Sequence, residues 1–366
     1  MRIACYSPRP SHFDLQPSRG GDPIFLQNLF DALRRRGHEL EIVSSLDLRD
    51  LWKGRVPARR LLREAFGIRG RMKRFSPDAW LVYDTSRTYP DLFGWWQRPR
   101  RYVLLSAHTW QSDRLPKGWR WLFASAHRLS LSRADRVIAA RPANGERLRR
   151  HGVAERRLAT LPPAVPIRPS VPSQREARLR LGLPLEVSIV LCVSRLTEPG
   201  AKDQKTEIVL QLLDSVFETP NRERVVVIVG DGPGRAVVEE RAAAIGEESV
   251  RLFRAVPNED LSWFFAACDV YAYPDSRDQP RLSVLEAQAC GRPVVTMRSP
   301  SAELTVEDGK SGILARDHTD FARQLSALAA DRARCETMGR AARDYVARSH
   351  SIDVRAKQIE AELSEK

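Results

Sequence analysis

The chain has 366 residues, of which 42% are hydrophobic and 29% are charged. This composition suffices for two hydrophobic cores and excludes an intrinsically disordered chain. The formal net charge of +14 comes from the first half, since residues 1–170 hold 33 basic and 15 acidic residues and the remainder holds 27 and 31. A basic half predicts partners that carry phosphate, such as a small-molecule ligand, an anionic membrane or a nucleic acid.

Membrane spans and disulfides are not expected. No run of about 18 apolar residues is present, and the N-terminus lacks the long apolar region of a secretory signal. The cysteines are dispersed without a C-x-x-C pair, which predicts reduced thiols and neither a disulfide framework nor a zinc site. We therefore expect a cytoplasmic protein.

In the first half, short apolar segments alternate with helical patterns, which is typical of parallel sheets with crossover helices. A helix is expected over residues 24–36, because Phe25, Leu29 and Leu33 fall on one face and Asp22 can cap its start. Strands are expected at residues 2–6, 40–43, 79–83, 102–105 and 136–139.

Repeated prolines over residues 161–184 disfavour helix and central strand, and the alternation then resumes. We expect strands at 188–193, 224–229, 250–253, 270–273 and 293–297, and helices at 205–217, 235–245, 258–267 and 283–289. We expect an N-terminal domain over 1–165, a linker over 166–184 and a second domain over 185–345. A C-terminal helix is expected over 346–366, and it could pack on the first domain.

Glycine patterns suggest one candidate phosphate site. Gly20 and Gly21 stand between the first expected strand and helix, where a ligand could approach the backbone and the helix N–H groups. The alternative is a tight turn between strand and helix, and the motif alone does not distinguish the turn from a phosphate site. Residues 230–234 are more typical of a turn than of a dinucleotide site, because Arg235 replaces the last glycine of that fingerprint.

The most informative stretch is 273–295, in which seven residues separate Asp278 from Glu286. Pro280 places Asp278 in a loop before a helix that starts near Leu282, and Glu286 then lies about one turn inside this helix. Carboxylates beside free helix N–H groups can hold sugar hydroxyls next to a phosphate. The alternative is a pair of solvated acids around an ordinary helix start.

This stretch resembles the C-terminal signature of glycosyltransferase family 4, which consists of an acid, seven residues, Glu-Ala and a Cys-Gly-x-Pro-Val-Val tail. Matches continue at Val193-Ser-Arg195-Leu, at Gly-Asp-Gly-Pro over 230–233, at Asp-Gly…Gly over 308–312 and at Gly-His-Glu-Leu over 37–40. The resemblance implies the α/β GT-B fold, with two Rossmann-like doubly wound domains facing each other across a cleft. The first domain would bind the acceptor and the second the nucleotide-sugar donor.

The resemblance also implies residue roles. Glu286 would accept hydrogen bonds from the ribose hydroxyls, Asp278 would contact hydroxyls of the donor sugar, and His108 would lie against that sugar. Arg195 and a lysine would neutralise the diphosphate, with Lys202 nearer the expected position than Lys205. The donor-binding backbone positions would be Gly20, Gly21, Leu282 and Ser283.

The roles given to Arg195 and the lysine fit the reaction, because cleavage of a sugar–phosphate bond places negative charge on the diphosphate. The sequence has no Asp-x-Asp triplet to hold a metal ion. We therefore expect metal-independent catalysis with retention, with no cofactor beyond the nucleotide-sugar co-substrate. Three departures from the family pattern concern the donor: Asp278 replaces a longer glutamate, Gln279-Pro280-Arg281 replaces Gly-Phe-Gly, and Pro163 replaces Asn-Gly.

The segment over residues 53–74 has nine basic residues and one acid, Glu64, interleaved with apolar side chains. A basic helix of this kind can lie on an anionic bilayer, and the alternative is a solvated arginine-rich face. The expected partners are a nucleotide-diphosphate sugar, a glycan or lipid-linked acceptor and this membrane surface, with no nucleic acid.

The sequence thus predicts a retaining glycosyltransferase that transfers a sugar to a hydroxyl of a glycan or lipid-linked acceptor, in polysaccharide or glycolipid synthesis. One alternative is a noncatalytic binding or scaffold protein with the GT-B fold. Another is a basic nucleic-acid-binding protein, although no recognised nucleic-acid module is present.

Overall fold

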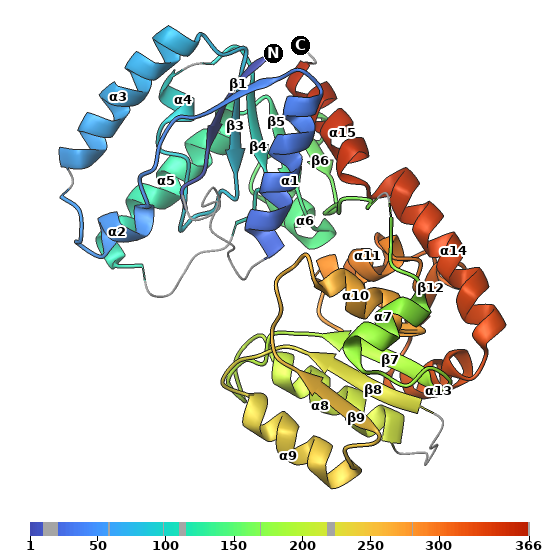
Figure 1. Ribbon diagram of the computed structural model, residues 1–366. Coiled ribbons are helices and arrows are strands. Elements are labelled where there is room, and N and C mark those ends of the chain that lie inside the picture. The colour runs from blue at the N-terminus through green and yellow to red at the C-terminus, as the bar shows by residue number, and fades with distance from the viewer. Residues whose placement is uncertain are drawn as a thin grey trace. The chain divides into compact units, whose positions relative to one another are not determined.

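Figure 1 shows the computed structural model of the chain. The structure describes residues 1–9, 21–57, 59–97, 99–109, 115–168, 170–217, 224–279 and 281–364. They form two compact units, which we call unit 1 (Met1–Ala164 with Ile352–Lys366) and unit 2 (Val165–Ser351).

Unit 1 is built on a parallel sheet whose described strands follow the order β2-β1-β3-β4-β5-β6. Its central strands are apolar runs that are buried along their whole length, as expected when helices cover both faces of a parallel sheet. The strands are β1 (Arg2–Tyr6), β2 (Glu39–Ile42), β3 (Ala79–Tyr83), β4 (Tyr102–Leu105), β5 (Arg136–Ala139) and β6 (Leu158–Thr160). The helices are α1 (Gly21–Arg35), α2 (Leu48–Trp52), α3 (Arg59–Phe75), α4 (Gly94–Gln97), α5 (Lys117–Arg133), α6 (Pro142–Arg150) and α15 (Ile352–Ser364).

Unit 2 repeats this architecture with the strand order β12-β11-β10-β7-β8-β9, again parallel throughout the described residues. The strands are β7 (Ser188–Val193), β8 (Arg224–Val229), β9 (Val250–Phe253), β10 (Val270–Tyr273), β11 (Val294–Met297) and β12 (Gly312–Ala315). The helices are α7 (Gln174–Leu181), α8 (Lys205–Phe217), α9 (Arg235–Ile245), α10 (Leu261–Ala267), α11 (Leu282–Ala289), α12 (Pro300–Glu303), α13 (His318–Ala329) and α14 (Arg332–Ser349). In both units the chain order reverses beside the first strand, and ligands of such sheets bind at the carboxyl ends of the strands at this point.

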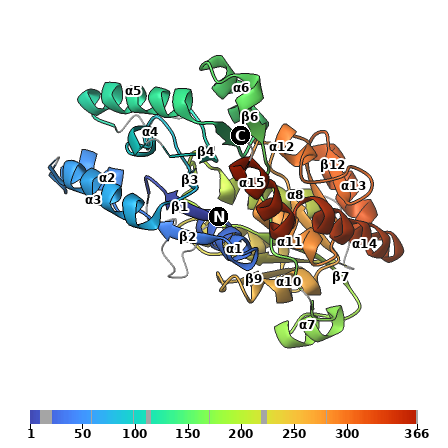
Figure 2. The same cartoon turned by 90° about the horizontal axis from the view of Figure 1, so that it is seen from above.

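The end of the chain returns to unit 1, where α15 packs beside α1 (Figure 1 and Figure 2). Glu362 accepts a hydrogen bond of 2.8 Å from Arg136, the first residue of β5, and Asp353 accepts one of 2.9 Å from Arg35 at the end of α1. The last helix is therefore a structural part of the first unit.

The expected linker over residues 166–184 contains a helix, so that prediction is wrong over Gln174–Leu181. Ser173 caps this helix, α7, by accepting a hydrogen bond of 3.2 Å from the N–H of Glu176, and Gly182 ends it in the left-handed conformation, with φ 63°. The prolines of the stretch lie before and after the helix and do not interrupt it.

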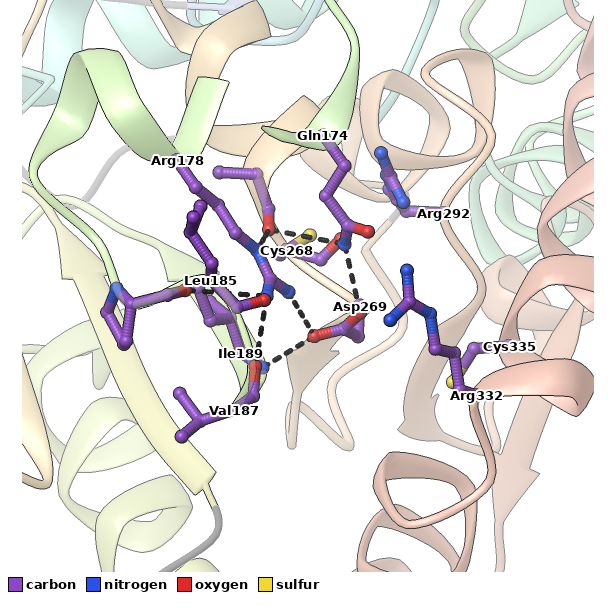
Figure 3. Close-up of polar contacts among 12 residues, drawn as sticks. Gln174, Arg178, Leu185, Val187, Ile189, Cys268, Asp269, Arg292, Arg332 and Cys335 are labelled. Carbon is purple, nitrogen blue, oxygen red and sulfur yellow. Dashed lines mark hydrogen bonds and ion pairs between the residues drawn. The ribbon is translucent and has the colours of Figure 1, made fainter. Parts of the chain in front are cut away.

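One buried arginine attaches α7 to the sheet of unit 2 (Figure 3). The Nε of Arg178 donates to the carbonyl of Ala267 at 2.9 Å, and its Nη1 donates to that of Leu185 at 2.6 Å. Its Nη2 lies 2.6 Å from Oδ2 of Asp269, which also accepts a hydrogen bond of 2.7 Å from the N–H of Ile189 in β7. The network holds α7 against the start of the central strand.

The glycine-rich turn after β8 serves close packing. A Cβ at Gly230 would lie 1.8 Å from the carbonyl oxygen of Ser194, and one at Gly232 would lie 2.1 Å from that of Leu196. These two glycines allow the turn to pack on the loop that carries Arg195. The turn interpretation of this motif is therefore confirmed.

Candidate active site

In unit 1, three polar residues lie near the carboxyl ends of neighbouring strands. His108 follows β4, and its Nε2 lies 3.1 Å from Oδ1 of Asp84, which directly follows β3. Arg9, near the end of β1, pairs with the same carboxylate. Both His108 and Asp84 are largely buried, so the imidazole is held in one orientation at the strand ends.

The expected glycine loop is described only at its end. Gly21 is the first residue of α1, and Gly20 lies outside the described residues. Phe25 in the following turn packs against Tyr83, the last residue of β3, with 6.3 Å between ring centroids. The first turns of α1 therefore lie beside the carboxyl end of this strand.

In unit 2, cationic side chains gather at the carboxyl ends of β7 and β10. Arg195 is in the exposed loop after β7, and Lys205 is the first residue of α8. The Nζ of Lys205 lies 3.5 Å from Oδ2 of Asp203. Burial, together with the charges of Arg195 and Arg281, lowers the pKa of the Lys205 ammonium, against the opposing effect of Asp203.

Lys205 therefore lies close enough to Arg195 for the two positive charges to repel each other. Lys202 is exposed in the loop before α8, whereas the Lys205 side chain is only 12% exposed. The preference for Lys202 rested on its distance along the chain from Arg195. The fold brings the start of α8 to this position, because Thr206 donates a hydrogen bond back to the carbonyl of Thr197.

A buried carboxylate organises the loop between β10 and α11. Asp275 accepts hydrogen bonds of 2.8 Å from the Nε of Arg277 and 3.0 Å from the Nε of Arg281. Burial alone would raise the pKa of Asp275, but these two guanidinium groups outweigh it and lower the pKa. Arg277 also donates to the backbone carbonyl of Asp203, which links this loop to the one before Lys205.

Asp278 is anchored to the first turn of α12. Its Oδ1 accepts a hydrogen bond of 2.8 Å from the backbone N–H of Ser301. This contact fixes the direction of the shorter aspartate arm. Pro280, the neighbouring departure from the family pattern, lies outside the described residues.

The start of α11 provides the expected helix terminus. Leu282 and Ser283 are its first residues, and the side chain of Arg281, the preceding residue, makes no capping hydrogen bond to it. The hydroxyl of Tyr271 donates to Oγ of Ser283 at 2.8 Å, which fixes this turn to β10. Backbone N–H groups at such a start attract anions.

Glu286 lies one turn further along α11, in a hollow of about 30 Å³. Burial raises the pKa of its carboxyl to about 7, against the opposing charge of Arg168. Arg168 is held beside the hollow by donating to Oγ of Ser262 at 3.3 Å and to the carbonyl of Asn258 at 3.4 Å. The hollow has room for a group of about the size of a water molecule.

The sequence analysis did not identify several charged residues of these clusters, among them Arg9, Asp84, Asp275, Arg277 and Arg281. Asp84 and Asp275 come within two residues of the end of a buried strand, and strand ends are where ligands of parallel sheets bind. Their position just after a buried strand is the sequence feature that could have identified these two carboxylates. Their arginine partners could not be assigned from the sequence, because loop conformation decides which guanidinium reaches which carboxylate.

Among the residues that the structure describes, no group of three or more His, Cys, Asp or Glu side chains is placed to hold a metal ion. Within the same residues, no helix combines the length and the apolar character needed to cross a bilayer. The five cysteines are free thiols, and Cys290 is the least buried of them.

Comparison with known sequences identifies the family. A sequence model described as Glycosyltransferase Family 4 matches residues 19–168, and one described as Glycosyl transferases group 1 matches residues 187–331. The chain belongs to glycosyltransferase family 4. The resemblance noted in the sequence is thereby confirmed for both halves of this family 4 protein.

The alignments with known relatives cover only part of each relative's length. The D-inositol 3-phosphate glycosyltransferase of Streptomyces bingchenggensis is 31% identical in an alignment that covers 69% of this chain and 64% of the relative. The protein of the same name from Streptomyces avermitilis is 35% identical over 57% of this chain and 47% of its own length. The family 4 chain thus spans about half to two thirds of the length of these relatives.

Solved structures share the fold of the family 4 chain at low identity. A glycosyltransferase from Rickettsia africae has a TM-score of 0.76 at 15% identity and covers 100% of this chain and 99% of its own. Anabaena HepE, solved in complex with UDP, has a TM-score of 0.74 at 18% identity and covers 100% of both chains. The two parallel-sheet units therefore have the GT-B fold, and the expected fold class is confirmed.

Proposed function

We propose that this chain is a glycosyltransferase that moves a sugar from a nucleoside-diphosphate sugar to a hydroxyl of a glycan or lipid-linked acceptor, in the synthesis of a polysaccharide or glycolipid. Unit 2 binds the donor, and unit 1 binds the acceptor and contributes His108. The observation that carries the proposal is a chain of contacts that joins Lys205, through Asp203, Arg277 and Asp275, to Arg281 at the open start of α11. The charge of Arg195 also acts on Lys205. Such an arrangement suits a diphosphate.

Each group of unit 2 has a part in the proposed reaction. Glu286 accepts hydrogen bonds from ribose hydroxyls, and Asp278 contacts hydroxyls of the donor sugar. As the bond between the anomeric carbon and the phosphate oxygen breaks, negative charge grows on the diphosphate. Arg195, Lys205 and the N–H groups of α11 stabilise that charge, so no metal ion is required.

We further propose that the anomeric configuration is retained. The acceptor hydroxyl forms its bond to the anomeric carbon on the face that the diphosphate leaves, and its proton passes to the departing phosphate oxygen. The family resemblance assigns to His108, held by Asp84 at 3.1 Å, the role of orienting hydroxyls of the donor sugar. The family membership and the fixed cations support this scheme.

The known proteins guide the choice of substrates for testing. Anabaena HepE was solved with UDP and with UDP-glucose, so UDP sugars are the first donors to test. The relatives are named for D-inositol 3-phosphate, so a phosphorylated polyol is an acceptor to test beside lipid-linked glycans.

The decisive experiment measures nucleotide release from UDP, GDP, ADP and dTDP sugars in the presence of EDTA, with acceptor present and absent. We expect acceptor-dependent release from one donor and its loss in Glu286→Ala, because the variant removes the ribose contact. The product linkage, read by NMR, should show retained configuration. Nucleotide binding without turnover on any acceptor would instead favour the noncatalytic alternative.

Unit 1 has a surface that suits an anionic membrane at the cytoplasmic face. On α3 the side chains of Leu62 and Phe66 are 65% and 66% exposed, and Phe66 packs edge-on against the exposed Trp96 at 6.4 Å. A groove of about 600 Å³ beside Trp96 is lined by basic side chains, among them Arg2, Arg69, Lys73 and Arg100. Exposed aromatic rings among cations are typical of membrane-surface helices.

We propose that this surface, formed by residues 53–74 together with Arg2, Trp96 and Arg100, docks unit 1 on the membrane that carries a lipid-linked acceptor. Reversing the exposed charges of Arg59, Arg60 and Arg63 to glutamate should abolish co-sedimentation with vesicles of phosphatidylglycerol, since each cation near such a surface contributes about 1 kcal/mol. The wild type should bind, and less at high salt. Unchanged binding of the triple variant would contradict the docking surface.

A further inference from the structure

Arg281 occupies a place where the family resemblance leads us to expect glycine, and its side chain is fixed there. Its Nε donates to Oδ2 of Asp275 at 3.0 Å, and Nη2 pairs with the same oxygen. The guanidinium carbon lies 5.2 Å from the centroid of the Tyr273 ring. The Asp275 side chain is only 4% exposed, whereas that of Arg281 is 17% exposed, so the guanidinium reaches the surface from a buried anchor.

The same anchor connects Arg281 to the loop of Lys205. Asp275 also holds Arg277, which donates to the carbonyl of Asp203, and Asp203 pairs with Lys205 at 3.5 Å. With Arg195, which lies beside Lys205, the cluster has four cations and two carboxylates. Positive charges outnumber negative ones in this cluster, which suits an anionic ligand such as a diphosphate.

We propose that Arg281 is an additional diphosphate-binding residue of this site and that Asp275 positions it. The inference rests on the proposed function and deepens it. Pro280 has no N–H, so the loop before α11 lacks a backbone donor at that position. The guanidinium of Arg281 supplies side-chain donors from the next residue, because its bonds to Asp275 use Nε and Nη2 and leave Nη1 for the phosphate oxygens.

The test compares nucleoside diphosphate with nucleoside monophosphate by calorimetry on the full chain in EDTA. The base is the one that the wild type binds among uridine, guanosine, adenosine and thymidine. Arg281→Ala should weaken diphosphate binding roughly tenfold or more and monophosphate binding much less, since a charge-assisted hydrogen bond to the second phosphate is lost. Arg241→Ala is the matched control, because Arg241 forms an exposed pair with Asp214 on α8.

The positioning role of Asp275 is tested by combining its substitution with that of Arg281. Asp275→Asn should lower the ratio of diphosphate to monophosphate affinity in the wild-type background and should add no further loss to Arg281→Ala. Thermal unfolding checks that each variant is folded. If Arg281→Ala does not fold, Arg281→Gln, which keeps a hydrogen bond to Asp275 and removes the charge, serves in its place.

The outcomes separate this inference from the proposed function. Loss of diphosphate selectivity in Arg281→Ala but not in Arg241→Ala supports the inference. Retained selectivity in Arg281→Ala overturns it and leaves the nucleotide-sugar proposal standing. A wild type that binds none of the four diphosphates overturns the proposed function and the inference with it.

Discussion

Glu286 is the residue whose protonation is most directly linked to nucleotide binding. Its carboxyl has a pKa of about 7 because burial disfavours the charge, with Arg168 opposing this effect. Ribose hydroxyls donate hydrogen bonds to a carboxylate, so a bound nucleotide favours the ionised form and lowers this pKa. Nucleotide binding below pH 7 is therefore accompanied by proton release and becomes stronger as the pH rises.

We predict that the dissociation constant of the nucleotide sugar, whose diphosphate has no group that titrates near neutral pH, falls roughly tenfold from pH 6 to pH 8, the range over which a group with this pKa ionises. Calorimetry in buffers of different ionisation enthalpy measures the affinity and the released proton together. Glu286→Gln keeps the shape and removes the titration, so its affinity should vary little with pH. A wild-type affinity that is flat over this range would show that Glu286 does not meet the ribose.

The place of a single residue in the fold was predictable where secondary structure alone fixes it. Glu286 and Ser283 lie on α11 as the motif spacing indicates, and Arg195 lies in the loop after a strand. The position of Lys205 was harder to predict, because a contact between Thr206 and Thr197, distant along the loop, decides where α8 starts. The ion pairs of Asp275 depend on loop conformation, which no local pattern encodes.

At the scale of elements, strands were the most predictable features. The apolar runs at 2–6, 79–83 and 188–193 are strands with the expected bounds, because buried parallel strands need continuous apolar sequence. Helix α7 was missed because the density of prolines around it outweighed its own signals, although Ser173 and Gly182 are good caps. Strands β6 and β12 were not predicted, and β6 has only three residues, which leaves little pattern to recognise.

The attachment of α7 yields a stability prediction. Arg178→Ala should lower the free energy of unfolding by about 3–5 kcal/mol, because it leaves Asp269 and several carbonyls buried without their donor. Chemical unfolding followed by circular dichroism measures this change. Arg175→Ala, an exposed position on the same helix, should change it by less than about 0.5 kcal/mol. Equal, small effects of both variants would contradict the anchoring role of Arg178.

At the scale of the whole molecule, the alternation of strands and helices predicted two parallel-sheet units, and the structure contains them. The chain divides after Ala164 and again after Ser351, so unit 1 is made from both ends of the sequence. Its closing helix is recognised through tertiary contacts such as that of Arg136 with Glu362. Most candidate donor groups, among them Arg195, Asp278 and Glu286, come from unit 2, whereas Gly21 and His108 belong to unit 1.

The central claim is that unit 2 neutralises a diphosphate with fixed cations. Its most direct test is a calorimetric titration of the full chain with UDP, GDP, ADP and dTDP in EDTA, for the wild type, Lys205→Ala and Lys202→Ala. We predict that the wild type binds one of the four, that Lys205→Ala weakens this binding about tenfold or more, and that Lys202→Ala binds as the wild type does. Binding that appears only when a divalent metal is added, or that is equal in the wild type and Lys205→Ala, would contradict the account.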